Sequence, residues 1–376
     1  MMKSSLIKVK DRTEDMVYSG NESNGKKNGI GTLKMKDGTN YSGNWVDDKM
    51  EGKGKLVIPN RYTYIGIFKN NLFEGKGILI YDNGQKFEGN FQNGKKQGQG
   101  KITFASNAFY DGTWHEDKAE GRGTFSNPDT NISLIGIFKN GSPFGQGNLQ
   151  YSNGTIYNGT FKNGLKDGYG NLTFPSGSKY EGHFLSDKKH GKGNYTYSSG
   201  SKYSGQWEND KKHGEGIFVY SNGSFYKGPF ERGLPHGQGK LTYKAGKGYY
   251  EGNWSNGQRN GEGKAQLEDG TLYIGVFRND KMTGIGKIIF VNGNEYNGEM
   301  EDGCMEGYGT MVYGEGQEYI GDWVQNRKQG KGMYMYGNGP YYEGDWKDDM
   351  KHGVGAYSSE NKNLNGNWVF NMFIGN

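Results

Sequence analysis

The chain has 376 residues and a formal net charge of +5, with 46 basic and 41 acidic side chains interspersed along it. A charge this small does not imply nucleic acid as a partner. The longest apolar run, residues 288–291, is far shorter than the roughly 20 residues of a membrane-spanning helix. Glycine accounts for 68 residues, but the 28 tyrosines, 19 phenylalanines and 7 tryptophans argue against a disordered chain.

Residues 1–17 precede the first repeated unit and are expected to form a charged lead segment. They are rich in lysine and arginine and contain no apolar stretch of the kind found in a secretory signal. If the chain contains a helix, we expect it between Lys3 and Asp15. The single cysteine, Cys304, cannot form an intramolecular disulfide, so we expect an intracellular, reducing compartment.

From residue 18 onward the chain repeats a unit of about 23 residues. Each unit starts with an anchor residue, usually tyrosine, followed two positions later by glycine and two positions after that by an aromatic residue, except that Glu22 and Met300 replace the aromatic residue in two units. In every complete unit a Gly-x-Gly motif begins eleven positions after the anchor, and all seven tryptophans occupy the aromatic position. The anchors are Tyr18, Tyr41, Tyr64, Phe87, Tyr110, Leu134, Tyr157, Tyr180, Tyr203, Tyr226, Tyr250, Tyr273, Tyr296, Tyr319, Tyr342 and Leu364. A period in this range is typical of a linear array of stacked units.

The residues of one unit predict two short strands. From Tyr41 to Trp45, apolar and polar residues alternate, which is the period of a strand with one apolar face. The alternation resumes at Gly52 and ends at Ile58, before a turn that leads into the next unit; Asn-Gly and Asp-Gly pairs mark many of these turns. We therefore predict an all-β fold, an elongated and twisted antiparallel meander of roughly thirty strands, about 150 Å long at the usual strand spacing.

The glycines of the pattern predict close approach of aromatic rings. Glycine is unfavourable inside a strand unless another group lies against its backbone. Gly43 and Gly54 fall on the same face of the predicted strands as Tyr41 and Trp45. We therefore expect the rings to cover bare backbone, an arrangement known to stabilise sheets.

The unit Tyr-x-Gly-x-Trp-x-x-Gly-x-x-x-x-Gly-x-Gly resembles the MORN repeat (membrane occupation and recognition nexus). On this resemblance, an array of fifteen complete repeats and a truncated sixteenth fills residues 18–376. Some members of the family carry a catalytic or membrane domain beside their repeats. Others consist almost entirely of repeats and are cytoskeletal scaffolds, such as the radial-spoke-head proteins of cilia. The chain is similar to the second kind, which implies a non-catalytic scaffold in the cytoskeleton, with the ciliary axoneme as the first expectation.

The predicted single-layer sheet also predicts a binding surface. Such a sheet leaves one side of its aromatic stripe open, and an exposed apolar stripe usually marks an interaction site. We expect a trough that binds cytoskeletal or axonemal proteins, and a homodimer through the C-terminal repeats, where an unpaired strand edge lacks proline and lysine. The predicted trough residues are Tyr41, Trp45, Tyr110, Trp114, Tyr203, Trp207, Tyr250, Trp254, Tyr319, Trp323, Tyr342 and Trp346.

Basic pairs recur in the connections between the two predicted strands of a unit. In register they would form a basic edge able to meet anionic lipid headgroups or an acidic protein surface. The alternative function is therefore a peripheral membrane adaptor that binds phosphoinositides. Aspartates in the same connections neutralise much of this charge, so ordinary solvated loop charge is also open. The predicted edge consists of Lys95, Lys96, Lys188, Lys189, Lys211, Lys212, Arg327 and Lys328.

The chain offers little that predicts catalysis or a cofactor. No Gly-x-Gly is followed by the Lys-Ser or Lys-Thr of a phosphate-binding loop. His190, His213 and His236 lie one period apart, and two strand spacings of roughly 10 Å are too wide for a shared zinc ion. Acidic residues recur in register between anchor and glycine, whereas catalytic residues are normally unique. We expect no cofactor, no metal and no enzymatic activity.

Overall fold

The computed structural model describes residues 15–337 and 339–376, which form β-strands joined by turns. Contacts divide the chain into two units, residues 1–188 and 189–376, and each is described by itself. The described residues contain no α-helix, and their two helical turns are the three-residue 3-10 segments Lys244–Gly246 and Gly314–Gly316. The helix considered for the lead segment falls on residues outside the described range, except for Asp15, which lies in a bend.

The strands of the first unit are β1 (Met16–Ser23), β2 (Lys26–Met35), β3 (Asn40–Val46), β4 (Lys49–Ile58), β5 (Tyr62–Lys69), β6 (Leu72–Tyr81), β7 (Lys86–Gln92), β8 (Lys95–Thr103), β9 (Phe109–His115), β10 (Lys118–Asn127), β11 (Ile132–Lys139), β12 (Ser142–Gln150), β13 (Ile156–Lys162), β14 (Leu165–Thr173) and β15 (Lys179–Leu185). β16 (Lys188–Thr196) begins at the boundary. The strands of the second unit continue with β17 (Lys202–Glu208), β18 (Lys211–Val219), β19 (Phe225–Glu231), β20 (Leu234–Pro235), β21 (Gly237–Thr242), β22 (Tyr249–Ser255), β23 (Gln258–Gln266), β24 (Leu272–Arg278), β25 (Lys281–Ile289), β26 (Glu295–Glu301), β27 (Cys304–Val312), β28 (Gln317–Val324), β29 (Arg327–Tyr336), β30 (Tyr341–Lys347), β31 (Met350–Ser359), β32 (Lys362–Val369) and β33 (Met372–Gly375).

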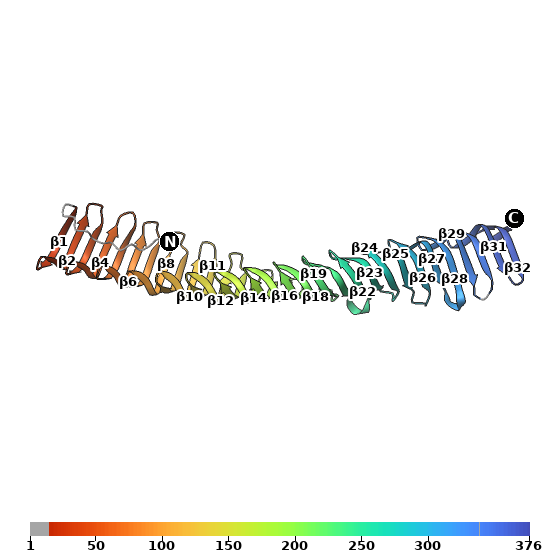
Figure 1. Ribbon diagram of the computed structural model, residues 1–376, viewed down its shortest axis with the longest axis horizontal. Coiled ribbons are helices and arrows are strands. Elements are labelled where there is room, and N and C mark those ends of the chain that lie inside the picture. Colours follow the sequence, from red (N-terminus) through yellow and green to blue (C-terminus); the bar gives the residue numbers. More distant parts are fainter. Residues whose placement is uncertain (1–14, 338) are drawn as a thin grey trace. The chain divides into compact units, whose positions relative to one another are not determined.

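Within each unit, consecutive strands pair antiparallel, so the prediction of an all-β antiparallel meander is confirmed. β3 pairs with β4 through Gly43 and Gly54, and β4 pairs with β5 through Gly54 and Gly66, so the glycines form a continuous row across the strands. Figure 1 shows the strands of each unit side by side and joined by hairpins. Among the described residues, strands pair with the strands that follow them along the chain; β19 pairs with both β20 and β21, which together form the second strand of that repeat, and the sheet is not closed.

A β-bulge in the hairpin within a repeat explains the first glycine of Gly-x-Gly. In the pairing of β3 with β4, the register shifts between the Gly43–Gly54 pair and the Trp45–Met50 pair. Gly52 lies within this shift and has a φ of +65°, which side chains with a Cβ rarely allow. β4 begins at Lys49, three residues before the start that the sequence pattern predicted. The pattern missed these residues because the bulge interrupts the alternation of apolar and polar side chains.

Two kinds of hairpin alternate along the chain. Asp47 and Asp48 connect β3 to β4 with φ values of +45° and +64°, which fits a two-residue type I′ loop. The connection from β6 to β7 is wider: Gly84, with φ +84°, donates its N–H to the carbonyl of Tyr81 at 3.0 Å. The tight turn therefore lies in the polar connection, and the Asn-Gly sequence belongs to a longer loop that ends in a left-handed glycine.

Each anchor tyrosine lies flat against the glycine row. A Cβ built on Gly43 or Gly54 would meet the Tyr41 side chain within 2.5–2.7 Å, so only glycine leaves room for the ring. The Tyr41 hydroxyl then donates to the backbone carbonyl of Asn44 at 2.9 Å. Aromatic cover of glycine, predicted from the spacing, is therefore present in the structure.

The rings also join one repeat to the next. Tyr41 packs edge-on against Trp45 of its own repeat and Phe68 of the following repeat, with ring centroids 4.9 and 5.1 Å apart. The Trp45 indole Nε1 donates to the carbonyl of Gly31 in the preceding repeat at 3.2 Å. The core is thus a ladder of rings in which each repeat buries its aromatic residues against its neighbours.

Candidate functional site

The residues predicted to line an open trough are buried within the chain itself. Their exposed fractions lie between 0% and 7% for Tyr41, Trp45, Tyr110, Trp114, Tyr203, Trp207, Tyr250, Trp254, Tyr319, Trp323, Tyr342 and Trp346. The premise that a single-layer sheet leaves these rings uncovered is wrong. The rings cover one another. Leu56 of β4 lies opposite Tyr41, and the Lys27 ammonium lies over the Trp45 ring. Partner binding on this face stays a prediction, and such a partner would contact the groups that cover the rings.

The basic pairs separate into two different roles. Lys95 points outward and its ammonium lies 3.4 Å from the carboxylate of Glu116, on the next hairpin. Lys96 turns onto the aromatic face, with its ammonium 5.5 Å from the centroids of both Phe87 and Trp114, and only 9% of the residue is exposed. Lys96 therefore stabilises the aromatic core through cation–π contacts, whereas Lys95 does not.

The other predicted pairs follow the same division. Lys189, Lys212 and Lys328 lie 4.8, 4.4 and 5.1 Å from the ring centroids of Trp207, Phe218 and Trp346 respectively. Lys188 and Lys211 are exposed, and Arg327 forms an ion pair with Asp348 at 3.1 Å. Four of the eight side chains of the predicted basic edge thus face the rings of the chain itself. Lipid binding stays a prediction that these four side chains do not support.

Burial changes the acidity of the cations on the aromatic face. Burial lowers the pKa of the Lys212 ammonium, and Gly233 stands where the following repeat elsewhere supplies an aspartate. Burial also lowers the pKa of Lys328, although the neighbouring Asp349 carboxylate acts in the opposite direction. These lysines lie within the fold's own packing, and the pKa shifts follow from that burial.

The aspartates of the tight turns link successive repeats, which the sequence analysis did not predict. Asp117 adopts a left-handed conformation, φ +68°, and its carboxylate accepts a 2.9 Å hydrogen bond from the backbone N–H of Lys96 in the preceding repeat. The equivalent bond from Lys27 is the main reason that the pKa of Asp48 is lowered. The equivalent position of other repeats carries aspartate, asparagine or glycine, because these residues adopt the left-handed conformation most readily.

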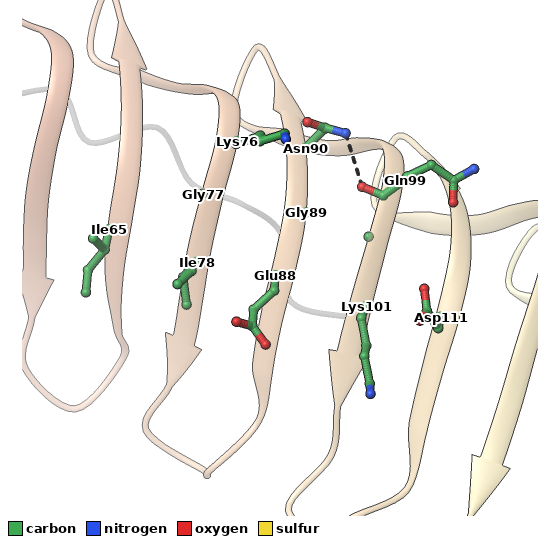
Figure 2. A pocket seen from close by; sticks show the side chains of 11 residues that line it. Ile65, Lys76, Gly77, Ile78, Glu88, Gly89, Asn90, Gln99, Lys101 and Asp111 are labelled. Atoms are coloured by element: carbon green, nitrogen blue, oxygen red, sulfur yellow. Dashed lines mark hydrogen bonds between the residues drawn. The ribbon is translucent and has the colours of Figure 1, made fainter.

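The face opposite the aromatic ladder carries a groove across β5 to β9. Its floor is the glycine row, and its walls are side chains that alternate with the ladder residues along each strand. Asn90 donates across the groove to the backbone carbonyl of Gln99 at 3.2 Å. Figure 2 shows two rows of side chains along it, one of Ile65, Ile78, Glu88, Lys101 and Asp111 and one of Lys76, Asn90 and Gln99.

An exposed apolar patch lies at one end of this groove. Ile65, Ile67 and Ile80 are 42%, 37% and 39% exposed, although most repeats place polar residues at these positions. Ile65 pairs across the strands with Ile78, which brings four isoleucines together in one repeat. The repeat pattern did not predict this patch, because its recurring spacing describes the aromatic face; isoleucine in positions that are usually polar was the available signal.

The geometry of the repeats agrees with a comparison of the chain with known families. The MORN repeat model matches residues 18–40, 41–61, 64–86, 87–109, 110–132, 135–156, 157–179, 180–202, 203–225, 226–247, 250–272, 273–295, 296–318, 319–341 and 342–363. The chain belongs to the MORN-repeat family. Fifteen consecutive MORN repeats cover nearly all of it, as the anchor spacing predicted. No curated protein matches the chain significantly.

Similarity to solved structures is weak. The SAS-4 (dCPAP) TCP domain of Drosophila melanogaster, in complex with a proline-rich motif of Ana2, is 17% identical, covers 42% of this chain and 85% of its own, and has a TM-score of 0.27. The TCP10 domain of Danio rerio CPAP, in complex with a STIL peptide, is 12% identical, with 66% and 90% covered and a TM-score of 0.20. TM-scores this low do not establish a common fold, and no function follows from them.

Two histidines of the predicted column lie beside acidic side chains of their own MORN repeats. His213 and His236 lie 3.6 and 3.4 Å from the carboxylates of Glu208 and Glu231, which belong to their own hairpins. Across residues 15–337 and 339–376, no group of three or more histidine, cysteine or acidic side chains is placed to hold a metal ion. In the same part of the chain, no helix has the length and apolar character needed to cross a membrane.

Proposed function

We propose that this MORN-repeat protein is a non-catalytic scaffold of a cytoskeletal assembly, and that the assembly is a ciliary axoneme, at the radial spoke head. The observation that carries partner binding is the exposed patch of Ile65, Ile67 and Ile80 on the outer face of the sheet. Exposed apolar groups that cluster beside a groove are typical of protein-binding surfaces. The axonemal location rests on the resemblance to family members that consist almost entirely of repeats.

The difference in exposure between the two faces of the sheet supports this proposal. The aromatic face is occupied by the packing of the repeats themselves, since its anchor rings are buried. The outer face does not take part in this packing of aromatic rings, and its side chains differ from repeat to repeat. An array with one constant face and one variable face suits a scaffold that holds different partners at different repeats.

Cosedimentation tests the proposal. The purified protein is mixed either with demembranated axonemes or with anionic vesicles that contain a phosphoinositide. We expect it to pellet with axonemes and not with vesicles. Replacing Ile65 and Ile67 by threonine should weaken axoneme binding about fivefold or more, the usual loss when apolar anchors leave an interface.

The control is Ile30→Thr, which changes an isoleucine that is also exposed on the outer face but lies in the first repeat. This variant should bind axonemes like the unchanged protein. Pelleting with vesicles and not with axonemes would overturn the proposal in favour of the phosphoinositide adaptor. Equal axoneme binding by the double variant would overturn the role of the isoleucine patch.

A further inference from the structure

Two successive repeats enclose the cation of their aromatic face in a box of four rings. Lys328 lies 5.7, 5.6, 5.1 and 5.1 Å from the ring centroids of Tyr313, Tyr319, Tyr334 and Trp346. Lys351 repeats the arrangement at 5.3, 5.4, 5.5 and 5.0 Å from Tyr336, Tyr342, Tyr357 and Trp368. The box therefore recurs in register, one ring coming from each of four positions of the repeat.

In the repeat that starts at Tyr250, one ring of this box is missing. The cation is Arg259, whose guanidinium carbon lies 5.6 Å from the Tyr250 ring and 5.1 Å from the Phe277 ring. The position that corresponds to Tyr334, six residues after the cation, is Ala265. A methyl group cannot cover a guanidinium, so one side of the cation faces a space that a ring fills elsewhere.

The structure contains a cavity at this place. It is lined by Tyr243, Arg259, Ala265 and Leu267, together with the turn that follows β21. Leu267 lies two residues after Ala265, at the position that corresponds to Tyr336, where most repeats carry an aromatic residue. The Leu267 side chain is 38% exposed. Two smaller side chains thus line the cavity at this repeat: Leu267 lies at its exposed side, and Ala265, which is 2% exposed, lies at its buried end.

The preceding turn widens the opening. It is one residue longer than in most repeats and forms the 3-10 segment Lys244–Gly246, in which Ala245 has a φ of +55°. Gly248 stands where several other repeats bury a serine or threonine, such as Ser224 and Thr271. The Lys247 ammonium lies at the rim, paired with Glu268.

We propose that this cavity binds an aromatic side chain, tyrosine or phenylalanine, presented by a segment of a partner protein. Electrostatic complementarity selects the occupant, because the exposed side of the Arg259 guanidinium attracts the negative face of a ring. Tyr243 lines the cavity beside Arg259, while the buried rings of Tyr250 and Phe277 contact the guanidinium from within the core. An incoming ring would therefore add a further aromatic contact to this cation, as in the box around Lys328. Asp280 binds the guanidinium from its other edge, with Nε to Oδ1 at 3.1 Å, and fixes its orientation.

Methyl NMR with defined probes tests this inference. N-acetyl-tyrosinamide is titrated into the full chain, and the methyl signals of Ala265 and Leu267 are followed. The control probe is N-acetyl-cyclohexylalaninamide, which has a similar shape but no π-face. We expect saturable shifts with the tyrosine probe, and about tenfold weaker binding of the cyclohexyl probe, the size of a partly desolvated cation–π contact.

Two variants separate the contribution of the space beside Ala265 from that of the Arg259 cation. Ala265→Leu restores a large side chain that Leu241 supplies at the same position one repeat earlier, and it should abolish probe binding while raising the melting temperature. Arg259→Gln should weaken the tyrosine probe about tenfold and leave the cyclohexyl probe unchanged. Lys264→Glu, on the opposite face of β23, is the matched control and should change neither.

The inference deepens the proposed scaffold function but fails independently of it, because the probe titrations need no axoneme. Absence of saturable binding, or equal affinity for the two probes with no effect of Arg259→Gln, would overturn it. Axoneme binding that Ala265→Leu leaves unchanged would overturn the assignment to a partner protein. None of these results would affect the isoleucine patch on the outer face.

Discussion

At the scale of single residues, the fold depends on the contact between an anchor tyrosine and two glycines. The Tyr296 ring leaves no space for a side chain at Gly298 or Gly309, which lie on paired strands. The same ring donates its hydroxyl hydrogen to the carbonyl of Glu299 at 2.7 Å. A change at either glycine therefore displaces the ring, its hydrogen bond and its contact with the next repeat.

Gly309→Ala tests this contact. The added Cβ would lie 2.5 Å from the Tyr296 ring, so the substitution should destabilise the protein by about 1–3 kcal/mol, as overpacking of a core usually does. The control is Gly314→Ala, five residues later, where a Cβ would meet no atom within 4 Å. Urea denaturation should separate the two variants. Equal stability of both would contradict the tight tyrosine–glycine packing.

Burial of the tyrosines predicts unfolding in alkali. Burial raises the pKa of Tyr250, Tyr273 and Tyr342 to about 12, from an ordinary value near 10. Because the folded pKa is the higher one, these tyrosines contribute stability that is complete below pH 10. That contribution is lost as the pH rises from about 10 through 12. The buried tyrosines should therefore ionise in this range together with the loss of the circular dichroism signal, as a rise in tyrosinate absorbance beyond that of the exposed tyrosines. Ionisation of all the tyrosines while the circular dichroism signal persists would contradict the burial.

At the scale of the hairpin, the tight turn serves both its own strands and the preceding repeat. The Asp117 carboxylate accepts the N–H of Lys96, and the Asp117 N–H donates to the Lys96 carbonyl at 3.1 Å. This pair of bonds fixes the spacing between successive tight turns. The left-handed conformation and the hydrogen bond contribute separately to the stability of the fold, and substitutions of Asp117 can distinguish the two contributions.

Three substitutions of Asp117 should rank in stability. Asp117→Asn keeps the acceptor and the left-handed preference, as Asn71 does two repeats earlier, and should be close to neutral. Asp117→Gly loses the hydrogen bond and should cost about 1 kcal/mol. Asp117→Ala also strains the left-handed backbone and should cost roughly 1–2 kcal/mol more. Thermal denaturation gives the order, and an alanine variant as stable as the asparagine variant would refute it.

At the scale of the whole molecule, the strand spacing predicts the size in solution. Strands that succeed one another without closing should extend the particle to about 150 Å, for which a rod has a radius of gyration of about 45 Å. A compact domain of this length would have about 21 Å. Small-angle scattering measures the difference directly. A value near that of a compact domain would show that the array folds back on itself.

The sequence by itself determined the fold class, the repeat boundaries and the residues of the core. The period, the anchor residues and the glycine pairs predicted an antiparallel meander with rings over bare backbone, because steric fit alone relates Tyr41 to Gly54. The start of β4 at Lys49 was missed, since a bulge breaks the alternation from which strands are recognised.

Only the tertiary structure decided which face is free to bind. Burial of Trp114 and the turning of Lys96 onto the rings depend on the neighbouring repeats, which pack over both side chains. The groove beside Ile65 and the cavity beside Ala265 likewise arise from strands that lie next to each other. A linear pattern specifies which residues alternate, but exposure is set by contacts between repeats, because each unit completes its core with its neighbours.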